Sequence, residues 1–334
     1  MTTKAIKKHL EQVINIAYKA GKVILDIYES DDLGIEYKSD ESSLTKADKA
    51  ANEVICAGLA KITPNIPIIS EENKEILYDA RKNFEYFWMV DPLDGTKEFI
   101  KKNGEFTVNI ALIHNQKSIA GVVYAPVLDK MYYAIKEEGA YIIKDNELVS
   151  LVANKYHKTD SHLKIVCSRS HLNDATQAFL DDYTQPELIS KGSSLKFLIL
   201  AEGGAELYPR LAPTMEWDTA AGHAVVEAAG GTVLQPNGEA LVYNKENLLN
   251  PYFVVAENYT TQKQNRLVGN IGFNYKFNNH LSLQSNARMN SYYNENDGRM
   301  ATGSLTLPYY RQAQNQYKEM NYEANLIYKN KFGA

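Results

Sequence analysis

The sequence predicts a mixed α/β or α+β layered sandwich over residues 1–257 of its 334 residues. One reason is that amphipathic helical patterns are mixed with short apolar strand patterns, several of which follow one another as a meander. A second reason is the 44% hydrophobic content, enough for a sizeable buried core without disulfides. A third observation sets a boundary: near Glu257 both composition and periodicity change, so residues 258–334 are expected to form a separate, strand-rich or disordered tail.

The helices are predicted from apolar residues that recur every three to four positions and from the signals at helix ends. Residues 1–30 form the first helix and residues 44–62 the second, with Asp48 in its first turn. The last helix begins at Asp218 and ends at Gly230-Gly231, since paired glycines commonly stop a helix. Shorter helices are expected at 96–101, after residue 171 and within 192–204.

The strands are short apolar runs bounded by turn residues. They are expected at 67–70, 85–90, 106–115, 118–126, 131–143 with a turn at Glu138-Gly139, 163–171 and 206–210. Two of them end in acidic residues: Glu71-Glu72 follows the first, and Asp91 follows the second.

The segment Asp91-Pro-Leu-Asp94-Gly95-Thr96 indicates a cation site. Two carboxylates so close together repel each other unless a cation lies between them, and Mg²⁺ prefers carboxylates with phosphate oxygens and water. The amides of Gly95 and Thr96 begin a predicted helix and are suited to bind phosphate. The alternative is a structural one, in which Asp94 and Asp218 are only helix N-caps.

The ordered set of acidic segments resembles the Mg²⁺-dependent, lithium-sensitive phosphatases of the inositol monophosphatase superfamily, most of all the CysQ-type 3'(2'),5'-bisphosphate nucleotidases. The resemblance covers about residues 5–257 and implies their layered α-β-α-β-α fold. The segments that carry it are Asp48, SEE (70–72), DPLDGTKEFI (91–100), GSSLKF (192–197), ELYPR (206–210) and WDTAAGHA (217–224).

The resemblance implies two or three Mg²⁺ ions and a role for each acidic residue. One ion would be held by Glu71, Asp91 and the carbonyl of Leu93, and a second by Asp91, Asp94 and Asp218. Asp48, Glu71 and Thr96 would form the catalytic set, with Thr96, oriented by Asp48, positioning and deprotonating the attacking water. The residues that would contact substrate are Glu71, Leu93, Asp94, Gly95, Thr96, Ser193, Lys196, Tyr208, Arg210 and Asp218.

The reaction implied is hydrolysis of the 3'-phosphate of adenosine 3',5'-bisphosphate to AMP and phosphate, in sulfur assimilation and nucleotide recycling. Conversion of 3'-phosphoadenosine 5'-phosphosulfate to adenosine 5'-phosphosulfate is a further possibility. Lys196 and Arg210 could bind the second phosphate, because Arg suits bidentate phosphate contact. Lys196 could instead be a solvated helix residue, and Tyr208 could serve only packing. His223 is expected to be a core histidine.

The composition also limits partners and location. The net charge of −5 argues against a nucleic-acid polymer as partner. No run is long enough for a transmembrane helix, and the N-terminus lacks the pattern of a signal peptide. Cys56 and Cys167 are expected to be buried thiols in a reducing compartment. We therefore expect a cytoplasmic protein, with peripheral association at the inner face of the inner membrane as a further possibility.

The tail differs in charge and in period. Residues 259–334 contain nine Lys and Arg and four Asp and Glu, a net of +5, so residues 1–258 carry −10. Apolar and polar residues alternate over 270–277, 281–290 and 322–332, with turns expected at 278–279 and 294–298. This pattern resembles a fragment of a SusC-like, TonB-dependent outer-membrane receptor. A chimeric chain would explain it; a soluble β appendage or a poorly ordered extension is the alternative.

Three other functions remain open at this point. An inositol or sugar phosphate monophosphatase would use the same chemistry on another substrate. A non-catalytic metal- or nucleotide-binding protein could keep the fold and release no phosphate. An outer-membrane transport component would require the tail to dominate the function.

Overall fold

A computed structural model of the chain describes residues 1–334 except 31, 38–42, 168–172, 258, 300–309 and 331–334. The described residues divide into two compact units. One runs from Met1 to the end of β14 (Phe253–Glu257), and the other consists of three long strands in the tail. Residues 168–171 of one predicted strand lie outside the described residues.

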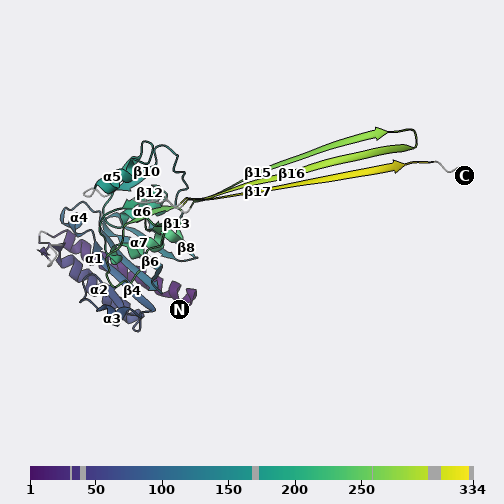
Figure 1. The fold of residues 1–334 in the computed structure, drawn as a ribbon. Coiled ribbons are helices and arrows are strands. Elements are labelled where there is room, and N and C mark those ends of the chain that lie inside the picture. The colour runs from purple at the N-terminus through teal and green to yellow at the C-terminus, as the bar shows by residue number, and fades with distance from the viewer. Residues whose placement is uncertain (31, 38–42, 168–172, 258, 300–309, 331–334) are drawn as a thin grey trace. The chain divides into compact units, whose positions relative to one another are not determined.

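The first unit is built around a seven-stranded sheet (Figure 1). Its strands, in their order across the sheet, are β3 (Ile68–Ser70), β4 (Tyr86–Asp94), β5 (Thr107–His114), β6 (Lys117–Ala125), β7 (Lys130–Ile135), β8 (Gly139–Lys144) and β9 (Glu147–Leu151). Only β3 and β4 pair in parallel; the remaining neighbours pair antiparallel. The predicted meander over residues 106–143 is confirmed.

Helices cover both faces of this sheet, and a second sheet follows. On one face lie α1 (Thr3–Tyr28) and α2 (Lys46–Ile62), and on the other α6 (Leu195–Ala201) and α7 (Glu216–Ala228). Beyond α6 and α7 lies a five-stranded sheet ordered β11 (Glu187–Ser190), β10 (Lys164–Cys167), β12 (Leu207–Arg210), β14 and β13 (Gly231–Leu234), with α5 (Asp174–Leu180) outside it. This confirms the predicted α-β-α-β-α order.

The short elements connect these layers. They are β1 (Glu36–Tyr37), β2 (Ser43–Leu44), α3 (Tyr78–Arg81), α4 (Thr96–Ile100) and the 3₁₀ turn η1 (Pro126–Leu128).

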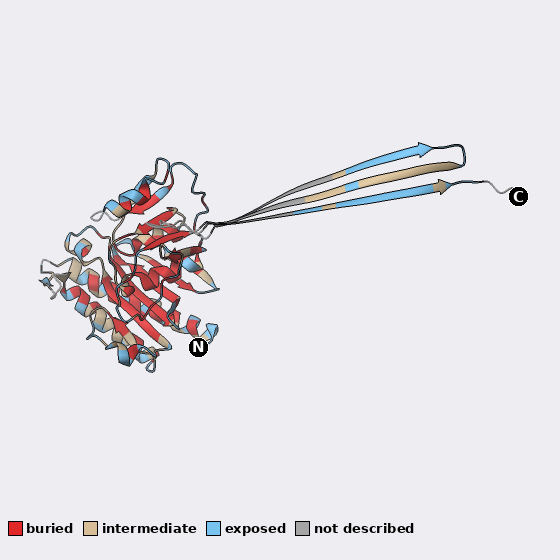
Figure 2. Ribbon diagram, viewed as in Figure 1, coloured by how far each residue is buried: buried red, intermediate tan, exposed pale blue. Residues whose placement is uncertain are grey.

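The core lies on both faces of the central sheet (Figure 2). Along β5, Ile110 and Leu112 pack towards α1 and α2, whereas Ala111 and Ile113 pack towards α6 and α7. A strand buried on both faces has no polar alternation, which explains its nearly continuous apolar sequence.

Three sequence-based expectations need correction. Helix α7 begins at Glu216, not at Asp218: Asp218 is the third residue of its first turn, and its carboxylate accepts a hydrogen bond from the amide of Met215, the N-cap. Asp94 is not an N-cap: β4 extends through it, and Gly95 precedes α4 as the N-cap. Cys167 is buried, but Cys56 is only half-buried.

The tail forms an antiparallel sheet of β15 (Tyr259–Lys276), β16 (Leu281–Arg299) and β17 (Tyr310–Tyr328). Its register aligns Ile271, Ala287 and Tyr322 in one row. The Ile271 side chain is 77% exposed, so this apolar face is uncovered within the unit. The turn expected at 278–279 is present. The turn expected at 294–298 is wrong, because backbone pairing on both sides of β16 overrides the local preference of this polar segment.

No helix among the described ranges combines the length and the apolarity required to cross a bilayer.

Candidate active site

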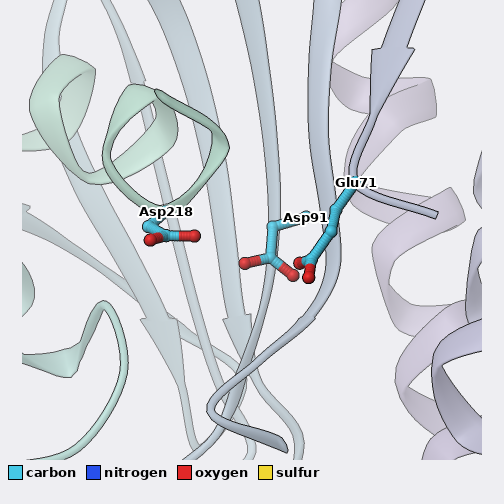
Figure 3. Close-up of side chains that lie close together, drawn as sticks. All are labelled: Glu71, Asp91 and Asp218. Carbon is cyan, nitrogen blue, oxygen red and sulfur yellow. The ribbon is translucent and has the colours of Figure 1, made fainter. Parts of the chain in front are cut away.

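Two neighbouring strands deliver the first two carboxylates. Because β3 and β4 run parallel, with Ser70 beside Val90, Glu71 and Asp91 emerge at the same edge of the sheet. The Glu71 amide donates to the Val90 carbonyl at 3.1 Å, which fixes this arrangement. Asp218 approaches from the first turn of α7, and one oxygen from each of the three carboxylates lies within 4.8 Å of the others (Figure 3).

Asp91 lies at the centre of this group. Its side chain is 1% exposed, and its Oδ1 accepts a hydrogen bond from the Leu93 amide at 3.1 Å. Burial, and then the neighbouring charges of Glu71, Asp94, Asp218 and Asp48, raise the pKa of Asp91 well above its ordinary value. Burial and the charges of Asp94 and Glu71 raise the pKa of Asp218 to about 8.

A bound divalent cation would remove the cause of these raised pKa values. A buried group of carboxylates is unfavourable as bare anions, whereas a hard divalent cation accepts this donor set of oxygen atoms and cancels the repulsion. The residues present therefore fit Mg²⁺.

Asp94 is outside this group and is held separately. Its Oδ2 accepts hydrogen bonds from the hydroxyls of Ser193 and Ser194, each at 2.8 Å, and from Asn109 Nδ2 at 3.3 Å. The next residue, Gly95, has a φ of 93°, and a Cβ there would approach the Glu105 carbonyl oxygen at 3.1 Å. Glycine at this position therefore allows the sharp exit from β4.

Asp48 and Thr96 lie in contact, as the family resemblance implies. Thr96 Oγ1 donates to Asp48 Oδ1 at 3.2 Å and lies 3.4 Å from the Leu93 carbonyl oxygen. Asp48 Oδ2 accepts from both the amide and the hydroxyl of Thr45, which completes the capping box of α2. Burial raises the pKa of Asp48. The capping box thus fixes the carboxylate that orients the Thr96 hydroxyl.

The residues that the resemblance assigns to substrate binding from residue 193 onwards line a small cavity of about 90 Å³, together with Asp94. Among them are Ser193, Lys196, Tyr208 and Arg210. The Lys196 ammonium donates to the Ser193 carbonyl at 2.6 Å, and burial lowers its pKa to about 8. A larger cavity of about 650 Å³ lies on the side of Glu71 and Trp217.

Tyr208 and Arg210 differ in how they are held. Tyr208 is buried and packs edge-on against Phe197 and Phe253, so packing accounts for much of its role. Arg210 Nη2 donates to the Pro213 carbonyl at 2.8 Å. Its buried Nε has no hydrogen-bond partner in the part of the chain that the structure describes, which leaves this cation with unused donor capacity at the cavity.

His223 is a core histidine. It is 3% exposed, and its Nδ1 lies 2.7 Å from the Tyr243 hydroxyl while its Nε2 lies 3.1 Å from Glu227.

Sequence reasoning missed Glu216, the fully buried carboxylate that begins α7. It accepts hydrogen bonds from the amides of Asn244 and Lys245 and from the Lys245 ammonium. Arg81 holds the same loop through Asn244 Oδ1 and the Lys245 carbonyl. The only sequence signal was an acidic residue in an otherwise apolar stretch before Asp218.

Replacing Glu216 with glutamine is expected to lower the free energy of unfolding by about 1–3 kcal/mol, because one of the two oxygens that accept from the Asn244 and Lys245 amides becomes an NH2 group and leaves a donor unpaired. Chemical denaturation without Mg²⁺ measures this. Glu187→Gln, on the exposed strand β11, is the matched control and should change the free energy by less than about 0.5 kcal/mol. Equal effects of the two substitutions would show that the Glu216 pair is not important for stability.

The layered fold, with Glu71 and Asp91 at neighbouring strand ends and Asp218 in a helix beside them, fits the class of metal-dependent phosphatases. The model of the inositol monophosphatase family matches residues 6–271, and the chain belongs to this family. The 3'(2'),5'-bisphosphate nucleotidase CysQ of Salmonella typhimurium is 46% identical over 255 residues, covering 74% of this chain and 98% of that protein. CysQ of Escherichia coli K12 is 44% identical, covering 74% and 99%.

One solved structure supports the same family, and a second shares the fold. The crystal structure of CysQ from Bacteroides thetaiotaomicron, described as a bacterial member of the inositol monophosphatase family, has 44% identity and a TM-score of 0.65. It matches 75% of this chain and 97% of its own. An inositol monophosphatase from Thermotoga maritima, 22% identical with a TM-score of 0.61, shares the fold.

Proposed function

We propose that this chain is a Mg²⁺-dependent 3'(2'),5'-bisphosphate nucleotidase that hydrolyses adenosine 3',5'-bisphosphate to AMP and phosphate. The observation that carries the proposal is the pair of cationic side chains, Lys196 and Arg210, in a cavity that also contains Asp94 and Asp218. A substrate with a second phosphate would find a cation for it beside the acidic site. In 3'-phosphoadenosine 5'-phosphosulfate the 5'-phosphosulfate would take the place of the second phosphate beside Lys196 and Arg210, so this compound is a second proposed substrate.

Glu71, Asp91, Asp94, Asp218 and the Leu93 carbonyl are the proposed Mg²⁺ ligands, with Asp91 shared. When bound, Mg²⁺ supplies an activated water and stabilises charge on the phosphate oxygens. The like charges around Asp91 support this assignment, since a cation relieves them. Asp94 would contribute through an oxygen that the serine and asparagine donors do not occupy.

Thr96 and Asp48 are the proposed groups that orient the attacking water. The Thr96 hydroxyl donates to Asp48, so its oxygen lone pairs remain free to accept the water proton. As Thr96 Oγ1 accepts that proton, its own hydroxyl proton would move along the existing hydrogen bond to Asp48 Oδ1. Ser193 and Tyr208 line the cavity, and their proposed role, together with that of Gly95, is to position substrate.

The lowered pKa of Lys196 predicts that hydrolysis of the bisphosphate depends on pH. Its pKa is lowered to about 8, so the cation that attracts the second phosphate is lost as the pH rises through that value. The kcat/KM for the bisphosphate should therefore fall above about pH 8, approaching about tenfold per pH unit. Lys196→Arg keeps the charge and should shift this alkaline limb upwards. An unchanged limb would mean that another group titrates.

The test of the function compares substrates. Phosphate release is measured with Mg²⁺, using adenosine 3',5'-bisphosphate and inositol 1-phosphate in parallel. Rapid release from the nucleotide alone supports the nucleotidase. A preference for inositol phosphate would indicate an inositol or sugar phosphate monophosphatase, and no release from either substrate by folded protein would indicate a binding protein.

For the tail we propose that residues 1–257 form the catalytic domain and that 258–334 are dispensable. The proposed source of the tail, a fragment of a SusC-like outer-membrane receptor joined to an unrelated enzyme, rests on the apolar–polar alternation of its sequence alone. A chain ending at Glu257 should keep the full kcat. Peptide mapping of the endogenous protein would show whether tail peptides follow Glu257 directly.

The proposed location is the cytoplasm. Peripheral association with the inner membrane would appear as co-sedimentation of the enzyme with anionic vesicles.

A further inference from the structure

Ser194 has an unusual role for its position. It is the N-cap of α6, where a serine hydroxyl commonly accepts a hydrogen bond from the first turn of the helix. No such capping bond is present. Instead the Ser194 hydroxyl lies 2.8 Å from Asp94 Oδ2 and 3.0 Å from the main-chain carbonyl oxygen of Asp218. The side chain thus contacts the two acidic residues and not its own helix.

This hydroxyl joins parts of the chain that lie far apart in sequence. Asp94 ends β4, Asp218 lies in the first turn of α7, and Ser194 begins α6. The single hydroxyl proton can be given to the carboxylate or to the carbonyl, so both acceptors compete for the same donor. Ser194 is 1% exposed, and solvent therefore offers no easy replacement for the bond.

The hydroxyl is itself oriented by strand β5. Asn109 Nδ2 donates to Ser194 Oγ at 2.9 Å, so one lone pair of this oxygen is occupied and its proton is directed towards the acceptors. Thr107 Oγ1 lies 2.9 Å from Asn109 Oδ1 and 2.6 Å from the Ser193 hydroxyl, so its one proton is shared between these two acceptors. Thr107, Asn109 and Ser194 are all buried, so the chain of hydrogen bonds is well shielded from water.

The hydrogen bonds that Asp94 accepts distinguish its two carboxylate oxygens. Those from Ser193, Ser194 and Asn109 all end on Oδ2. Oδ1 is then the oxygen that remains for a cation. Groups that orient a metal ligand typically change metal affinity by about 10–100-fold when removed.

We propose that Ser194, oriented by Asn109, is a positioning residue for the cation shared by Asp94 and Asp218. Its hydroxyl fixes the Asp94 carboxylate relative to the α7 backbone, so that the two ligands are held at one separation. This inference rests on the proposed assignment of Asp94 as a metal ligand.

The experiment measures metal binding directly and without turnover. Mn²⁺ is titrated into the metal-free full-length protein in the presence of inorganic phosphate, and free Mn²⁺ is read by electron paramagnetic resonance. Ser194→Ala is expected to weaken one class of Mn²⁺ sites by about 10–100-fold and leave the other within about twofold. The loss of one buried hydroxyl should leave the protein folded, which its thermal melting curve checks.

Ser118→Ala is the matched control. Ser118 is also buried, and its hydroxyl also donates to a main-chain carbonyl of α7, that of Ala220 at 2.7 Å. Among the described residues this hydroxyl has no acidic side chain as a hydrogen-bond partner. This variant should bind Mn²⁺ as the unmodified protein does. If both variants lose the same affinity, general loosening of α7 is the cause and the proposal is wrong.

Asp94→Asn tests whether Asp94 is a metal ligand, independently of the role of Ser194. It should abolish the same class of Mn²⁺ sites that Ser194→Ala weakens. If Asp94→Asn binds Mn²⁺ normally, the metal assignment itself fails, and the role of Ser194 fails with it. If Asp94→Asn loses the site and Ser194→Ala does not, only the role of Ser194 is overturned.

Discussion

Asp91→Asn is expected to lower kcat by about a thousandfold or more, because it removes the carboxylate shared by the proposed cations. The substitution should at the same time make the metal-free protein more stable. The pKa of Asp91 is raised in the folded state, so folding disfavours its ionised form, and this cost is present at pH values above the ordinary range of a carboxyl group. Asparagine cannot ionise and removes the cost.

The melting temperature measures the second part of this prediction. In EDTA, Asp91→Asn should melt a few degrees above the unmodified protein, by about 2–4 °C for each kcal/mol gained. Added Mg²⁺ should raise the melting temperature of the unmodified protein far more than that of the variant. Asp182→Asn, in an exposed ion pair with Lys158, is the control and should change neither activity nor Mg²⁺ stabilisation. Near-normal turnover by Asp91→Asn would disprove the metal assignment.

Thr96→Val is expected to reduce kcat by about 10²–10⁴-fold with little change in KM, because it removes the hydroxyl proposed to orient the water. Asp48→Asn should cost a comparable amount, since Asp48 acts through the same hydroxyl. The double variant should then be barely worse than either single one, because residues that act as a unit are not additive.

Thr96→Ser provides the internal control, as it keeps the hydroxyl and loses only a methyl group. It should retain most of the activity. Fully additive losses in the double variant would mean that Asp48 and Thr96 act separately, and Asp48 would then be only the residue that caps α2.

The sequence by itself indicated a mixed α/β layered sandwich and placed Glu71 and Asp91 at the ends of two short apolar strands. The resemblance to the inositol monophosphatase superfamily joined these residues into one site, and only the tertiary structure showed that β3 and β4 pair in parallel, which brings Glu71 and Asp91 to one edge. Asp48 was visible as a residue of a helix start. The strand ends and the helix start depend on local patterns and on spacing along the chain, which a single sequence displays.

The tertiary structure decided what depends on contacts between distant segments. Glu216 pairs with residues 244 and 245, and its meaning appears only when that loop folds over α7. Ser194 directly precedes helix α6, the usual place of a capping serine. Its hydroxyl is instead directed to Asp94 and Asp218, because β4, α6 and α7 converge there. The segment 294–298 is a turn by composition and a strand in the sheet, because its neighbours supply the backbone hydrogen bonds. Hydrogen bonds between residues far apart in the chain leave no periodic pattern in the sequence. They could therefore be identified only in the folded structure.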